Sequence, residues 1–270
     1  MKYKLVAIDL DDTLLRDDLK ISPQTIEAIQ EAVKKGVTVT LATGRMFQSA
    51  AQYAKEIQLD VPIITYQGAL IKNVLSGEVL YERLLPYDLT IQVIQELRQQ
   101  NKHIQIYLHD ELIVESHNKY VEKYSKASNV PFKKVDDLIE TMDKLQTKPL
   151  KIITIDEPEV IKGMEKEWQT KYGDLAHVTI SKPDFLEISH REASKGQAIQ
   201  YLAQSKGITM DQVIAIGDSY NDRDMIEVAG LGVAMGNGHP DIKALADYVT
   251  KTNNDHGVWE VLQKFVLNEE

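Results

Sequence analysis

The chain has 270 residues, a formal net charge of −10 and no cysteine. The acidic balance argues against nucleic acid or an anionic membrane as the main partner, because both would repel the protein surface. The absence of cysteine excludes disulfides, thiolate zinc sites and cysteine nucleophiles, so the chemistry must use oxygen or nitrogen groups.

A strand followed by acidic residues opens the chain. Residues 5–8 form an apolar run, typical of a strand covered on both faces in a parallel sheet, and Asp9, Asp11 and Asp12 follow it. Ligands usually bind at this carboxyl edge of an open α/β sheet. If the backbone stays extended, Asp9 and Asp11 point to the same side, where a hard cation such as Mg²⁺ would offset their repulsion. A solvated, aspartate-rich turn is the alternative.

The second predicted strand ends at a candidate phosphate-binding turn. A helix is expected between residues 22 and 36, a strand over residues 37–42 and a second helix over residues 46–57. Thr43 and Gly44 lie between this strand and the second helix. A hydroxyl and backbone N–H groups at a helix N-terminus favour an anion. An ordinary turn capped by threonine is the alternative.

The order of the elements changes in the middle of the chain. Residues 62–66 are expected to form a third strand and residues 70–82 a hairpin, after which the alternation of strands and helices stops. The elements expected next are helices over 87–100, 119–128 and 158–172 and strands over 103–109, 112–115, 150–155, 176–180 and 185–189. This order is typical of an antiparallel sheet with helices on one face.

We therefore expect two domains. Residues 1–83 and 190–270 would form a discontinuous α/β core with a Rossmann-like parallel sheet, and residues 84–189 an inserted α+β domain with an antiparallel sheet.

A lysine begins the first helix after the insertion. Ser194 is a candidate N-cap, and Lys195 falls in the first turn of a helix that ends at Gly207. A lysine at this place opposes the helix dipole, so a nearby anion would explain it. A solvated surface lysine is the alternative.

A second strand ends in polar residues as the first does. Residues 213–216 are expected to form a buried strand, followed by Asp218, Asn221 and Asp222. Two strands of one parallel sheet that both end in acids would bring their carboxylates to one edge. Asp218 would then complete the metal site begun by Asp9 and Asp11, with Asn221 or Asp222 ligating or orienting from behind. A strand over residues 231–235 and a helix over residues 258–267 close the chain.

Several common motifs are absent. The sequence contains no G-x-x-x-x-G-K-[ST], G-x-S-x-G or H-E-x-x-H, which removes the simplest nucleotide-triphosphatase, hydrolase and zinc-protease interpretations. It also has neither a signal-peptide pattern nor an apolar run of membrane-spanning length. We therefore expect a soluble, cytoplasmic protein.

Four short motifs in this order resemble those of the haloacid dehalogenase (HAD) superfamily of phosphatases. The insertion resembles the large α+β cap, type IIB, of the Cof-type branch, which lies between the second and third motifs. The four motifs are Asp9-Leu10-Asp11-Asp12-Thr13, Thr43-Gly44-Arg45, Lys195 and Gly217-Asp218-Ser219-Tyr220-Asn221-Asp222. Gln67-Gly68-Ala69 departs from the usual Asn-Gly-Ala, and Gly236-Asn237-Gly238 from the usual Gly-Asn-Ala.

The resemblance implies roles for these residues. Asp9 would be the nucleophile and Asp11 the general acid and base, and Mg²⁺ would be held by Asp9, the backbone carbonyl of Asp11 and Asp218. The implied phosphate contacts are the Leu10 backbone, Thr43, Gly44, Lys195 and Asn221, and Asp222 would support the site from behind.

The chemistry suits these residue types. A carboxylate is ionised at neutral pH, so Asp9 can attack without a base, and Mg²⁺ with Lys195 would offset its repulsion from a phosphate monoester. Asp11 would protonate the leaving group and then activate the water that hydrolyses the aspartyl-phosphate. We expect a Mg²⁺-dependent phosphatase acting on a small phosphorylated metabolite, such as a sugar phosphate.

Other functions stay open. The substrate could be pyridoxal phosphate or a flavin-pathway phosphate, and the phosphoryl group could be transferred to a sugar hydroxyl by a phosphotransferase or phosphomutase. A phospho-accepting signalling receiver is a further alternative, but receivers are much shorter than this chain and have no cap.

Tyr107, His109 and Lys151 are candidate substrate contacts in the insertion. No obligate protein partner is evident, and we expect a monomer.

Overall fold

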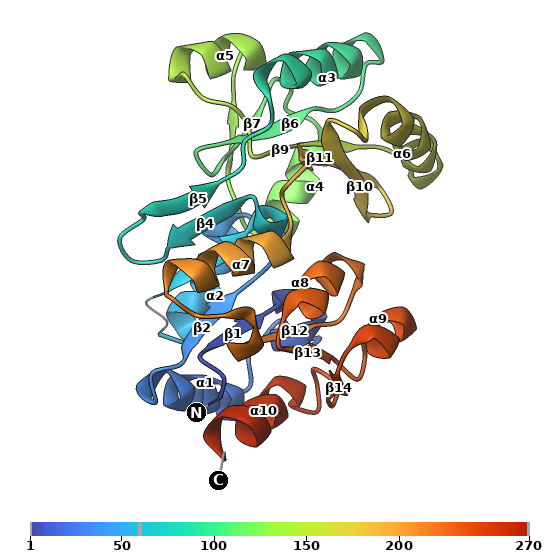
Figure 1. Cartoon of the computed structure of the whole chain (residues 1–270). Helices are drawn as coiled ribbons and strands as arrows, with labels where there is room; N and C mark the ends of the chain where they lie inside the picture. Colours follow the sequence, from blue (N-terminus) through green and yellow to red (C-terminus); the bar gives the residue numbers. More distant parts are fainter. Residues whose placement is uncertain (1, 59–60, 269–270) are drawn as a thin grey trace. The chain divides into compact units, whose positions relative to one another are not determined.

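The computed structural model describes residues 2–58 and 61–268 of the chain. It divides into two compact units: one comprises the residues up to Tyr81 and from Ser194 onward, and the other comprises Glu82–Ala193. Figure 1 colours the chain along its sequence, so the first unit contains both the blue and the red segments.

The first unit is built on a five-stranded parallel sheet in the order β14-β13-β12-β1-β2. These strands are β1 (Leu5–Ile8), β2 (Thr38–Leu41), β12 (Val213–Gly217), β13 (Leu231–Ala234) and β14 (Tyr248–Val249). Ile8 of β1 pairs with Ile216 of β12 on one side and with Leu41 of β2 on the other. Because the strands are parallel and in register, the residues that follow them emerge side by side at one edge.

Helices cover both faces of this sheet, and Figure 1 labels them. They are α1 (Pro23–Lys34), α2 (Phe47–Glu56), α7 (Lys195–Ser205), α8 (Arg223–Val228), α9 (Pro240–Leu245) and α10 (Gly257–Leu262). Residues of α7, α8 and α9 form a buried cluster with Leu5, Ala7, Val213 and Ala215 of the sheet. On the other face α1 contacts α10. A sheet covered on both faces explains why its central strands β1 and β12 are continuous apolar runs.

The third expected strand belongs to a separate small sheet. β3 (Pro62–Thr65), β4 (Leu70–Asn73) and β5 (Val79–Glu82) lie in that order, and β3 pairs antiparallel with β4. β3 still runs beside β2, joined to it by one parallel bridge between Ala42 and Ile64. Pro62 has no N–H group to donate to a neighbouring strand. Its carbonyl accepts a hydrogen bond from the Thr40 hydroxyl at 2.7 Å, which also ties β3 to β2.

The second unit contains a six-stranded sheet in the order β10-β11-β9-β6-β7-β8. The strands are β6 (Gln105–Leu108), β7 (Glu111–Val114), β8 (Phe132–Lys134), β9 (Lys151–Ile155), β10 (Ala176–Lys182) and β11 (Phe185–His190). The pairs are antiparallel except β7 with β8, which is parallel. The helices are α3 (Tyr87–Gln99), α4 (Lys119–Ser128), α5 (Leu138–Leu145) and α6 (Pro158–Tyr172).

One of these helices differs from the expected arrangement. α3, α5 and α6 share a buried cluster with Ile106 and Leu108 of β6. Tyr107 lies between those two residues and therefore points to the opposite face, where its ring contacts Tyr124 of α4. The expectation of helices on one face is thus wrong for α4. None of the helices that the structure describes is long and apolar enough to cross a membrane.

Candidate active site

The structure brings three of the predicted acids, Asp9, Asp218 and Asp222, together at the carboxyl edge of the parallel sheet. Asp9 follows β1 and Asp218 follows β12, and these strands are neighbours. Carboxylate oxygens of Asp9, Asp218 and Asp222 all lie within 4.8 Å of one another. The hydroxyl of Thr13 donates to Oδ1 of Asp218 at 3.2 Å. A cluster of three carboxylates, with Asp9 and Asp222 buried and Asp218 partly buried, therefore lies at the edge where the sequence predicted the site.

Lys195 is the cation of this cluster. Its ammonium group lies 2.6 Å from Oδ1 of Asp9 and 2.6 Å from Oδ1 of Asp222. The lysine is 1% exposed. Ser194 caps α7 by accepting from the backbone N–H of Gln197 at 3.2 Å. The solvated surface lysine is therefore excluded, and the two carboxylates explain why a lysine begins this helix.

Asp222 is held by hydrogen bonds on both of its oxygens. Oδ2 accepts from the backbone N–H groups of Asp218 at 2.9 Å and Ser219 at 3.1 Å, while Oδ1 accepts from Lys195. A Cβ on Gly217 would lie 2.5 Å from the Cβ of Asp222, so a side chain there would displace it. This arrangement fits a residue that orients Asp218 and Lys195.

The cluster carries more negative than positive charge. Burial, followed by the charge of Asp222, raises the pKa of Asp9 well above its ordinary value, although Lys195 lowers it. Burial, with the charges of Asp222 and Asp12, raises the pKa of Asp218 to about 7. Burial by itself would lower the pKa of Lys195, but the two carboxylates outweigh it and raise that pKa. Three carboxylates face one ammonium group, so the cluster has an excess of negative charge. Carboxylate oxygens are hard ligands, and the cluster therefore fits a divalent cation.

Asp11 lies outside the cluster. Its carboxylate is half exposed and accepts two hydrogen bonds from Arg45, from Nε at 2.9 Å and from Nη2 at 2.5 Å. The uninterrupted extended backbone assumed for Asp9 and Asp11 ends at Asp9, because residues 10–14 form a helical turn; within it Asp11 has φ −71° and ψ 130°, and Asp12 has a φ of 57°. The backbone N–H of Leu15 closes this turn on the carbonyl of Leu10 at 2.8 Å. The two acids therefore have different surroundings.

The expected phosphate-binding residues gather at neighbouring turns. Thr43 is buried, and its hydroxyl accepts from the backbone N–H of Arg45 at 3.2 Å. Nδ2 of Asn221 donates to Oε1 of Gln67 at 3.3 Å, and Gly44 lies directly against the Gln67 side chain. Leu10 follows Asp9 and is fully buried.

Sequence reasoning missed the contacts of Gln67 and Thr13. Gln67 follows β3, which runs beside β2, so it is a polar residue after a buried strand, like Asp9 and Asp218. That signal could have found it. In the second unit, Tyr107 and Lys151 are buried, with Lys151 paired to Glu187 at 2.8 Å, whereas His109 is exposed.

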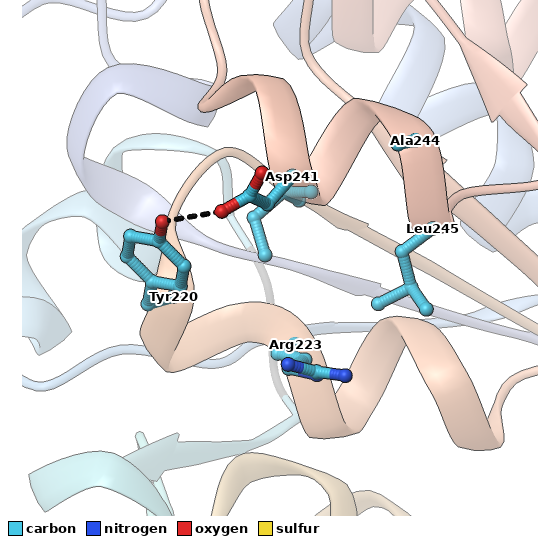
Figure 2. Close-up of a pocket in the computed structure, with 6 residues that line it drawn as sticks. Tyr220, Arg223, Asp241, Ala244 and Leu245 are labelled. Atoms are coloured by element: carbon cyan, nitrogen blue, oxygen red, sulfur yellow. Dashed lines mark hydrogen bonds between the residues drawn. The ribbon is translucent and has the colours of Figure 1, made fainter.

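A cavity of about 310 Å³ lies beside the turn that follows Asp218, and residues other than the three clustered carboxylates line it (Figure 2). Figure 2 shows the hydrogen bond between two of its lining residues, in which the Tyr220 hydroxyl donates to Asp241; the two oxygens lie 2.6 Å apart. Arg223 and Leu245 also line it. None of the three clustered carboxylates is among its lining residues, so this cavity is not the candidate active site.

Comparison with known proteins agrees with this geometry. Residues 6–262 match the model of the haloacid dehalogenase-like hydrolase family. A 5-amino-6-(5-phospho-D-ribitylamino)uracil phosphatase of Bacillus subtilis, YcsE, is 33% identical, over 98% of this chain and 96% of its own length. The pyridoxal phosphate phosphatase YbhA of Escherichia coli is 27% identical, over 99% of this chain and 100% of its own length.

A solved structure shows the same fold. The crystal structure of TM0651 from Thermotoga maritima superposes with a TM-score of 0.89 at 32% identity and covers 97% of each chain. The predicted fold class, a parallel-sheet core with a separate antiparallel sheet, is thereby confirmed. The chain belongs to the haloacid dehalogenase-like hydrolase family and is a phosphatase.

Proposed function

We propose that the protein is a Mg²⁺-dependent phosphomonoester hydrolase that acts on a small phosphorylated metabolite, such as a sugar phosphate, through an aspartyl-phosphate at Asp9. The observation that carries this proposal is the buried Lys195, whose ammonium group touches Asp9 and Asp222 beside Asp218. The fixed positive charge of Lys195 lowers the pKa of Asp9 and so favours its ionised form, the form that would attack phosphorus.

Asp9, Asp218 and the backbone carbonyl of Asp11 would hold the metal. When bound, Mg²⁺ supplies positive charge that offsets the repulsion between the carboxylate cluster and a phosphate dianion. Asp222 acts behind them, since its two oxygens already accept from Lys195 and two backbone N–H groups. Asp222 therefore holds Asp218 and Lys195 in place.

The reaction uses two carboxylates in turn. An oxygen of Asp9 forms a bond to phosphorus, the bond between phosphorus and the ester oxygen breaks, and Asp11 protonates the departing oxygen. Asp11 then accepts a proton from the water that attacks the aspartyl-phosphate, which releases phosphate and restores Asp9. Both oxygens of Asp11 now accept from Arg45, so one of these bonds must be exchanged for the substrate oxygen.

The remaining residues bind the phosphate and exclude water. The Leu10 backbone, Thr43, Gly44, Lys195 and Asn221 would contact the phosphate oxygens. Residues 1–83 with 190–270 would act as the catalytic core and residues 84–189 as the cap. We place the activity in the cytoplasm as part of the same proposal, because phosphorylated metabolites do not cross membranes unaided.

Two relatives suggest a second candidate substrate class. YcsE is named for a phosphate of the ribitylaminouracil type and YbhA for pyridoxal phosphate. An assay of phosphate release across sugar phosphates, pyridoxal phosphate and ribityl phosphates, with Mg²⁺ and with EDTA, tests both candidates. Transfer to a sugar hydroxyl without free phosphate would identify a phosphotransferase, and activity that is unchanged by EDTA would contradict the metal requirement.

A further inference from the structure

We propose that Gln67 is a positioning residue that sets the phosphate-binding groups of Gly44 and Asn221 relative to each other. This rests on the phosphatase function proposed above. Gln67 lies on the turn after β3, in the same unit as the carboxylate cluster. Its role follows from the backbone of that turn and from the contacts of its side chain.

The backbone of the turn is fixed from two sides. Tyr66, Gln67 and Gly68 all have positive φ, of 53°, 56° and 95°, which is costly for residues other than glycine and persists only where the surroundings impose it. The N–H of Tyr66 donates to the carbonyl of Arg45 at 3.0 Å, and that of Gln67 to the carbonyl of Thr43 at 3.1 Å. The turn is thus tied to the segment that contains Gly44.

The other side of the turn packs against the start of α7. A Cβ on Gly68 would lie 2.1 Å from the carbonyl oxygen of Ser194 and 2.9 Å from the backbone nitrogen of Lys195. Only glycine permits this approach. The turn therefore holds Gln67 at a fixed place relative to both Thr43 and Lys195.

The side chain of Gln67 reaches two predicted phosphate-binding residues at once. Its Oε1 accepts from Nδ2 of Asn221 at 3.3 Å. A Cβ on Gly44 would lie 2.4 Å from Nε2 of Gln67 and 2.9 Å from its Cδ, so the carboxamide rests directly on the Gly44 backbone. One carboxamide thus joins the turn after β2 to the turn after β12.

This contact decides how the Asn221 carboxamide is oriented. Oδ1 of Asn221 accepts from the hydroxyl of Ser219 at 2.5 Å, and one hydrogen of Nδ2 goes to Gln67. The second hydrogen of Nδ2 then points in a fixed direction and can donate to a phosphate oxygen. Asn221 is exposed, so without Gln67 its side chain would sample more rotamers.

The test compares variants of Gln67 by their affinity for inorganic phosphate, measured by calorimetry in the presence of Mg²⁺. Gln67→Met keeps the length of the side chain but cannot accept from Asn221, and we expect a loss of about threefold to tenfold. Gln67→Glu keeps the acceptor but adds a negative charge beside Gly44, and we expect a loss of at least about tenfold that shrinks at high salt. Gln204→Met, on the exposed side of α7, is the matched control.

A double-mutant cycle distinguishes positioning from a structural effect. If Gln67 acts through Asn221, Gln67→Met in an Asn221→Ala background should weaken phosphate binding by less than about twofold. Equal losses in both backgrounds, or a wild-type affinity in Gln67→Met, would overturn the proposal. The proposal would also be overturned if Gln67→Met lost phosphate affinity only to the extent that its unfolding temperature fell.

The same experiment separates this proposal from the proposed function. If the wild type binds inorganic phosphate but hydrolyses no phosphomonoester, including p-nitrophenyl phosphate, the proposed phosphatase function is contradicted. The phosphate affinities of the Gln67 variants would still test the positioning role of Gln67. If the wild type does not bind phosphate, the role of Gln67 is overturned as well. For an active enzyme we expect KM for p-nitrophenyl phosphate to rise in Gln67→Met by more than kcat falls, because the groups it positions bind phosphate before the chemical step.

Discussion

The ammonium group of Lys195 lies 2.6 Å from a carboxylate oxygen of Asp9, and both residues are almost completely buried. The same group is equally close to Asp222. A buried charge is costly unless it is paired, so each of these groups depends on the others. The pairing links catalysis to stability, because the residue that would attack phosphorus is also part of the ion cluster at the sheet edge.

Replacing Lys195 with methionine should therefore both inactivate and destabilise the protein. The change leaves buried carboxylates without their cation, and removing one partner of a buried pair costs about 3–5 kcal/mol in the free energy of unfolding. Urea unfolding at neutral pH and an assay of phosphate release measure the two effects. Lys206→Met, at the exposed end of α7, is the control and should change stability by less than about 0.5 kcal/mol. Wild-type stability in Lys195→Met would contradict the buried pairing.

Asp9→Asn should abolish activity without lowering stability. The amide has nearly the shape of the carboxylate and can still accept from Lys195, but it cannot attack phosphorus. Turnover should fall by at least about 10³-fold. The repulsion from Asp222 that helps to raise the pKa of Asp9 is also removed, so the metal-free protein should unfold at the same temperature or higher. Retained turnover would mean that the nucleophile is another residue.

The meeting of Asp9, Asp218 and Lys195 could be predicted because it depends on long-range order that the sequence pattern encodes. β1 and β12 are continuous apolar runs, which indicates a parallel sheet, and parallel strands in register end at one edge. The cap-sized insertion was equally visible, because strands and helices stop alternating there. Neither conclusion needed the position of any loop.

Features that depend on short or local geometry could not be predicted. α8, α9, β8 and β14 have six, six, three and two residues, too few for a periodic pattern. α5 was also missed, although Leu138, Met142 and Leu145 recur in it at helical spacing. The direction of Asp11 follows from the turn over residues 10–14 and from the hydrogen bonds with Arg45, which is 34 residues away in the sequence. The role of Gln67 depends on contacts with residues distant in sequence.

Adding Mg²⁺ to metal-free protein should raise its unfolding temperature. Binding to the folded state alone stabilises it by about 2.7 kcal/mol when the free ion is at a hundred times its Kd. Asp218→Asn should abolish most of this shift, since Asp218 is one of the three clustered carboxylates. Asp211→Asn removes an exposed carboxylate of the same unit and should leave the shift unchanged. An equal shift in both variants would place the ion elsewhere.

Asp11→Asn should slow substrates according to their leaving groups. An alkyl phosphate needs a proton on its departing oxygen, so its first turnover should slow by about 10²- to 10⁴-fold. p-Nitrophenyl phosphate has an acidic leaving group and should lose much less in that step. Rapid-quench measurement of a single turnover isolates the step from the later attack of water. Equal losses for the two esters would count against Asp11 as the general acid.

The second unit should lose stability as the pH falls, because of His103. Oδ1 of Asn118 caps α4, so Nδ2 of Asn118 is the group that donates to Nδ1 of His103, at 3.1 Å, and the neutral ring donates from Nε2 to Gln105 at 3.0 Å. Burial lowers the pKa of His103 below its ordinary value of 6.5. Below about pH 6.5 the unfolded chain binds a proton that the folded unit resists, so the free energy of unfolding falls by up to about 1.4 kcal/mol per pH unit.

Urea unfolding between pH 5 and pH 7.5, followed by the fluorescence of Trp168 in a Trp259→Phe background, reports on this unit alone. Burial also lowers the pKa of His190, so the informative quantity is the difference in slope between the parent and His103→Gln. Glutamine cannot take up a proton, and the slope should become flatter in that variant. His177→Gln, which removes an exposed histidine of β10, should keep the slope of the parent. An unchanged slope in His103→Gln would contradict the prediction, because it would show that His103 takes up its proton equally in the folded and the unfolded unit.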